Sequence, residues 1–196
     1  SGAGLAFGTG AFTAAELSGR QVSVAVTNDA QSLIALVPND ELHAVRLEDG
    51  ELVIGLENPG VNQKSVYQFG YLAERTDVSV SPQDSFPYTQ RTPSAGGDDF
   101  GSAFLLRNQT ASEQELELDF ELTTDDEDGG SFDTSFWFEI HDDGERIALF
   151  SDDYTDTVRL GSGEALGVSF LLDVPDDTLG ESINGSLTIS AGETVV

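Results

Sequence analysis

Apolar and polar side chains alternate along most of this chain. The clearest run covers residues 114–123, where Leu116, Leu118, Phe120 and Leu122 alternate with four acidic side chains. Successive side chains of a β-strand point to opposite faces. The run therefore predicts a strand with one buried face and one acidic face in water.

The same period of two predicts roughly ten to twelve strands. Val22, Val24 and Val26 alternate with small residues, and Asp49-Gly50 between two alternating runs predicts a hairpin. No segment shows a convincing helical period. This pattern is typical of an all-β fold, an antiparallel jelly roll or β-sandwich. The remaining strands are expected at residues 32–37, 67–71, 77–80, 103–108, 135–141, 146–150, 157–160, 166–173 and 186–190.

Two stretches interrupt the alternation without dividing the chain. Residues 81–99 carry three prolines and Gly96-Gly97, and residues 123–134 form an acidic tip. A loop as long as 81–99 within a compact domain is usually functional or mobile. We therefore expect one β-sandwich domain over residues 14–196, preceded by a distinct segment, residues 1–13.

Acidic side chains far outnumber basic ones. The 196 residues include 36 Asp and Glu but 8 Lys and Arg, for a formal net charge of −28. Repulsion on this scale destabilises a compact fold in dilute buffer, whereas at 1 M salt the Debye length falls to about 3 Å and screens it. The composition therefore predicts a halophilic protein. Because no basic patch could neutralise phosphates, nucleic acid is not an expected partner.

Cys and Met are both absent. Without Cys, the chain can form neither disulfides nor thiolate metal sites. Since translation starts with Met, its absence predicts processing, either by removal of one Met ahead of Ser1 or by cleavage of an export signal before small residues. We expect export to the cell surface or the medium. No apolar run of 18 residues occurs, so the mature chain is not expected to span a membrane.

Residues 1–13 carry no charge at all. In an extended strand Leu5, Phe7 and Ala11 share one face, and Phe12 follows them. Exposure of such a segment is unfavourable on a molecule otherwise coated with carboxylates, so we expect it to be buried. It is either the first strand of its own domain or a strand donated to a neighbouring copy. Donation head to tail need not close, and would give a filament.

Motifs near both ends carry a family resemblance. Residues 6–13 (AFGTGAFT) precede the strand 21–26 (QVSVAV), and LGSGE at 160–164 is followed by GSLTISA at 185–191. These stretches resemble the TasA/camelysin-like secreted fibre proteins and their archaeal bundling-pilus relatives, above all haloarchaeal ones. The resemblance covers little of residues 32–99. It implies a jelly-roll body that polymerises into extracellular fibres by donor-strand complementation, with Leu5, Phe7, Ala11 and Phe12 as the donated side chains.

Catalytic signatures are scarce. His43 and His141 are the only histidines, no Ser, His and Asp order stands out, and no phosphate-loop spacing occurs. Any pair among 36 acids is uninformative without geometry. We expect no enzyme. Trp137, between Phe136 and Phe138, is expected in the core rather than on a sugar-binding surface.

Two kinds of ligand remain open. Asp125, Asp126 and Asp128 supply the clustered oxygen donors that calcium prefers, although solvated acidic turns are the simpler interpretation and no cofactor is required. The sequons that begin at Asn108 and Asn184 predict N-linked glycans in an exported protein.

The sequence therefore predicts a pilin-like structural subunit of an extracellular archaeal filament. Its partners would be copies of itself, and it would support adhesion or biofilm formation. The alternative is a monomeric cell-surface module that binds glycan or calcium.

Overall fold

The structure, a computed structural model, describes residues 20–28, 33–61, 65–72, 101–124, 135–142, 145–151, 155–174 and 182–191. These residues form twelve strands and no helix, which confirms the all-β prediction, and thus no helix that could cross a membrane. In chain order the strands are β1 (Arg20–Asn28), β2 (Ile34–Pro38), β3 (Val45–Glu48), β4 (Glu51–Val61), β5 (Ser65–Phe69), β6 (Phe104–Asn108), β7 (Gln114–Thr124), β8 (Ser135–Asp142), β9 (Glu145–Ser151), β10 (Asp156–Leu160), β11 (Ala165–Val174) and β12 (Ser182–Ala191).

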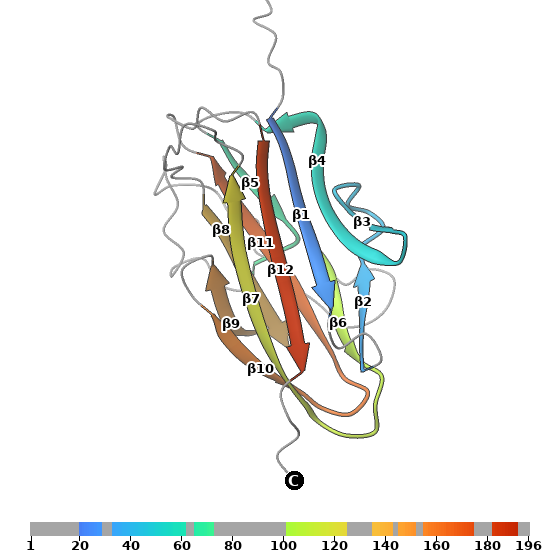
Figure 1. Cartoon of the computed structure of the whole chain (residues 1–196). Helices are drawn as coiled ribbons and strands as arrows, with labels where there is room; N and C mark the ends of the chain where they lie inside the picture. Colours follow the sequence, from blue (N-terminus) through green and yellow to red (C-terminus); the bar gives the residue numbers. More distant parts are fainter. Residues whose placement is uncertain are drawn as a thin grey trace, which may run out of the picture.

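The strands form two six-stranded sheets that lie face to face (Figure 1). The first sheet has the order β10-β7-β12-β1-β4-β3. The second has the order β2-β6-β11-β8-β9, and β5 continues beside β11 beyond the end of β6. Side chains from both sheets form one buried cluster, so the two layers share a core.

One pairing departs from the predicted antiparallel arrangement. β1 and β12 run parallel, with Val24 opposite Gly185 and Val26 opposite Leu187. The first sheet is therefore mixed. Period-two alternation predicts which residues form a strand, but it contains no information about the direction of the neighbouring strand.

The predicted hairpin and the predicted acidic strand are both confirmed. Asp49 and Gly50 join β3 to β4 with φ angles of 52° and 90°, the left-handed conformation that a two-residue hairpin turn requires. On β7, Leu116, Leu118 and Phe120 are buried, and the acidic residues between them face outwards. The inner faces of the sandwich are thus apolar and the outer face of β7 is acidic.

Trp137 does not enter the core, and this prediction is wrong. It alternates with Phe136 and Phe138, whose rings are buried between the sheets, and so it points to the opposite face of β8. There it is half-buried and packs against Leu72 and Leu171 in a small second cluster. The predicted strand at 77–80 and the segment 1–13 lie outside the described residues.

The core packing around Gly185 gives a testable expectation. A Cβ atom at Gly185 would lie 2.7 Å from Cζ of Phe120, and Phe136 and Phe138, each 5.0 Å away between ring centroids, hold that ring in place. Gly185→Ala should therefore lower the free energy of unfolding by about 1–3 kcal/mol. Denaturant unfolding at constant salt measures the change.

Ser190→Ala, on the outer face of the same strand, is the matched control and should change stability by less than about 0.5 kcal/mol. Equal unfolding midpoints for the two variants would contradict the packing described for Gly185.

Candidate functional site

A groove opens between the edges of the two sheets on one side of the molecule. It lies where β2, the last strand of one sheet, faces β3 and the start of β4 in the other. We call it the edge groove. Six of its nine lining residues are apolar, although polar atoms make up about half of its surface. The lining consists of Val26, Ile34, Ala35, Leu36, Leu47, Gly50, Glu51, Leu52 and Gln109.

The edge groove suits apolar side chains carried on a strand. Val26, Ile34 and Leu52 are buried, whereas Leu47 is 51% exposed, so an apolar surface continues from the core into solvent. The volume of about 280 Å³ lies below the usual range of about 300–1,000 Å³ for small-molecule pockets. Edge strands such as β2 and β3 also present main-chain groups for pairing with a further strand.

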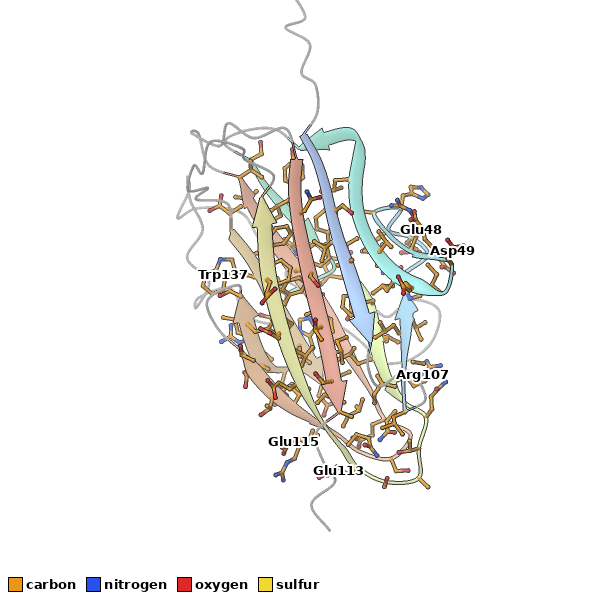
Figure 2. The ribbon with its side chains drawn as sticks, viewed as in Figure 1. Glu48, Asp49, Arg107, Glu113, Glu115 and Trp137 are labelled. Carbon is orange, nitrogen blue, oxygen red and sulfur yellow. The ribbon has the colours of Figure 1, made fainter. Side chains whose placement is uncertain are left out.

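An acidic turn borders this groove. Glu48 and Asp49 lie at the tip of the β3–β4 hairpin beside β2, as Figure 2 shows, and Glu51 follows at the start of β4. All three are exposed. Arg46 Nε donates to Glu48 Oε1 at 2.6 Å, which partly neutralises the turn.

The edge groove lies far from the point where the N-terminal segment joins the body. β1 starts at Arg20, and its seventh residue, Val26, lines the groove. At about 3.3 Å per residue, the groove is about 20 Å along β1 from Arg20. In Figure 1, β1 begins at the upper end of the sandwich and descends towards β2. The attachment point and the groove are therefore at opposite ends of one strand.

Asn108, a predicted glycosylation site, is 2% exposed. Its Nδ2 lies 2.8, 3.0 and 2.9 Å from the carbonyl oxygens of Ser112, Leu160 and Gly161. Its Oδ1 accepts hydrogen bonds from the backbone N and the hydroxyl of Thr110, both at 2.8 Å. In the folded chain the amide therefore ties the end of β6 to the β6–β7 turn, to the end of β10 and to the β10–β11 turn, which argues against a glycan on this nitrogen.

The other predicted site residues fall in different places. Asn184 is half-buried on β12, opposite Ser23 and Thr123, and its glycan remains a prediction. The donor-strand residues Leu5, Phe7, Ala11 and Phe12 and the calcium candidates Asp125, Asp126 and Asp128 lie outside the described residues. Among the residues that the structure does describe, no three His, Cys, Asp or Glu side chains gather closely enough for a metal ion.

His141 belongs to a buried ionic cluster on the outer face of β8 and β9. Glu139 and His141 are each 1% exposed, and Glu139 Oε1 lies 3.0 Å from His141 Nδ1, although the two are not aligned for a hydrogen bond. The other oxygen, Oε2, lies 3.6 Å from Nη1 of Arg146. Buried charges are stable in proteins when they are paired in this way. His43, in contrast, is exposed in the turn before β3.

The hydroxyl of Ser102 lies beside Gly167, which also borders His141. A Cβ atom at Gly167 would lie 2.1 Å from Ser102 Oγ and 3.4 Å from His141 Cδ2, so both side chains pack against this glycine. Serine, histidine and a carboxylate are the groups of a catalytic triad. However, Ser102 is fully buried, and a substrate could not reach it in this arrangement. We interpret the cluster as structural.

Sequence reasoning did not identify the edge groove or the ionic cluster. Alternation marks Leu47 as apolar, but it does not show that the edge of a sheet leaves this side chain half exposed. Glu139 and His141 alternate with Phe138 and Ile140, which predicts a solvated position rather than a buried one. Both the edge groove and the ionic cluster depend on which elements pack beside a strand, and alternation within the strand does not specify them.

No model of a known protein family matches the chain, and no curated protein matches it either. The fibre-protein resemblance therefore depends on the motifs at the two ends of the sequence.

The bonding of Asn108 predicts a specific loss of stability. Asn108→Asp keeps the shape but places a carboxylate against three carbonyl oxygens, and should cost about 2–5 kcal/mol of unfolding free energy. Gln109→Glu adds the same charge next to it on an exposed side chain, and should stay within about 0.5 kcal/mol. Peptide mass spectrometry of the native protein should find Asn108 unmodified. A glycan there, or equal stability of both variants, would contradict the bonding described.

The ionic cluster predicts a second loss of stability. Glu139→Gln removes the buried carboxylate that lies against both Arg146 and His141, and should lower the free energy of unfolding by about 3–5 kcal/mol. Glu117→Gln, on the exposed face of β7, removes the same charge and should have almost no effect. Denaturant unfolding at constant salt compares them, and an unchanged midpoint for Glu139→Gln would rule out a structural ion pair.

Proposed function

We propose that the protein is a structural subunit of an extracellular filament, in which residues 1–13 of one copy pair as a strand in the edge groove of the next. The observation that carries the proposal is a groove between two edge strands, with six apolar side chains in its lining, in a chain with an uncharged apolar segment. The proposal also assigns the body to the jelly-roll type of the fibre proteins that the end motifs resemble.

The anchors of the donated strand match the chemistry of the groove. Leu5, Phe7 and Ala11 share one face of an extended strand, and the floor of the groove is made of Val26, Ile34 and Leu52. Full burial of a Leu or Phe side chain contributes about 1.5–3 kcal/mol. Main-chain pairing with an edge strand adds register and further affinity.

The length of the chain permits both insertion into the same copy and donation to a neighbour, and the fibre-protein resemblance of the end motifs is what favours donation. Residues 13–19 span at most about 25 Å when fully extended. This length exceeds the distance of about 20 Å from Arg20 to the groove along β1, and still more residues separate Leu5 and Phe7 from Arg20. A neighbour stacked end to end would receive the same strand. Repetition of the contact is heterologous and produces a filament.

The amino-acid composition supports a high-salt environment for this filament. A net charge of −28 suits a surface in concentrated salt, where carboxylates are screened. We therefore propose a secreted, halophilic, archaeal subunit that acts in adhesion or biofilm formation. It needs no catalytic residue and no cofactor.

Charge placed in the groove should abolish assembly without unfolding the body. Leu47→Asp puts a carboxylate on a half-exposed lining residue, and should remove sedimentable filaments in molar salt because the donated strand would have to bury that charge. Ile147→Asp, on β9 and 46% exposed, is the matched control and should assemble normally. Sedimentation and negative-stain microscopy measure the outcome.

Deletion of residues 1–13 should have the same effect as Leu47→Asp. Normal filaments from either variant, or a native protein that stays monomeric in molar salt, would contradict the proposal. Such a monomer would favour a surface module that binds glycan or calcium.

A further inference from the structure

For specific assembly, the edge groove must bind one extended segment in preference to others. Hydrogen bonds along the edge of a sheet are independent of sequence, so β2 and β3 can in principle pair with any extended segment. The chain contains many competitors, since its own strands are apolar on one face. Selection must therefore come from side chains at the groove.

Seven of the twelve described strands carry at least one carboxylate, which the segment 1–13 lacks, whereas β1, β2, β5, β6 and β12 carry none. β7 carries Glu115, Glu117, Asp119 and Glu121 on the face opposite its buried residues. In the whole chain 36 residues are acidic, yet none lies in residues 1–13. A carboxylate at the groove would thus distinguish this segment from the acidic strands.

Carboxylates occupy that position. Glu51 lines the groove, and Asp49 precedes it at the tip of the hairpin. Both are exposed, and neither has an ion-pair partner among the described residues, whereas Glu48 is paired with Arg46. Like charges brought side by side on neighbouring strands are destabilising.

We infer that Asp49 and Glu51 are specificity determinants of the edge groove, which exclude acidic strands and admit the chargeless residues 1–13 of a second copy. This inference rests on the proposed function. Exclusion by an unfavourable charge contact is the usual way in which an interface rejects wrong partners. It also protects the groove from acidic strands of partly folded copies.

Substitutions at Ala6 in the full-length protein test the inference. In an extended strand Ala6 lies on the face opposite Leu5 and Phe7 and shares its face with Phe12, so a side chain at position 6 leaves the anchors of the opposite face unchanged. We would compare Ala6→Glu, Ala6→Gln and Ala6→Arg in the native background and in the double variant D49N/E51Q. Asn tolerates positive φ and suits the turn position of Asp49.

The critical concentration for assembly, measured by light scattering at the lowest salt concentration at which the native chain assembles, is the readout. Relative to A6Q, we expect A6E to raise the critical concentration about fivefold and A6R to lower it. This is the size of effect that one pair of charges has at a partly exposed position. In the D49N/E51Q background the three values should converge. The spread should also narrow as salt increases.

The results separate this inference from the proposed function. If the native chain assembles only when residues 1–13 are present, but A6E and A6Q have equal critical concentrations, the specificity role is overturned and the filament stands. The same holds if their difference persists in D49N/E51Q. If the native chain does not assemble, or assembles without residues 1–13, the proposed function fails, and the inference fails with it.

Discussion

The ring of Phe138 joins the two sheets, and the rest of the molecule depends on this contact. Its centroid lies 5.0 Å from that of Phe120 in the facing sheet, and 4.9 and 5.5 Å from those of Phe150 and Phe170 in its own. All four side chains are buried. Aromatic pairs at such distances contribute beyond their buried area. Because these rings fix the inner face of each strand, they also fix which side chains must face outwards.

The aromatic core does not extend to every edge of the sandwich. On one side β9 and β10, the edge strands of the two sheets, lie in contact. On the other, β2 and β3 are also in contact, and the edge groove lies beside them. A chain that carries so much negative charge has few uncharged segments able to cover this groove.

The sequence predicts much of the strand content and little of what surrounds it. Alternation locates β7 and the Asp49-Gly50 turn because both signals are local. It does not reveal that β1 pairs in parallel with β12, since that contact joins distant parts of the chain. It assigns Trp137 to the core because period two does not show which face is inward. The sequon at Asn108 matches the glycosylation pattern, but the pattern does not show that this side chain is buried. The edge groove likewise depends on how β4 positions its hairpin beside β2, which is not a local property of the sequence.

The parallel pairing of β1 with β12 has a mechanical consequence. β1 lies between β12 and β4, bonded to both along most of its length. A tensile load applied ahead of Arg20 acts along the axis of β1, across two rows of hydrogen bonds. In this shear geometry the bonds must break together, whereas a strand peeled from an edge loses them one at a time. The strand that follows the N-terminal segment is thereby anchored where the sheet best resists being pulled apart.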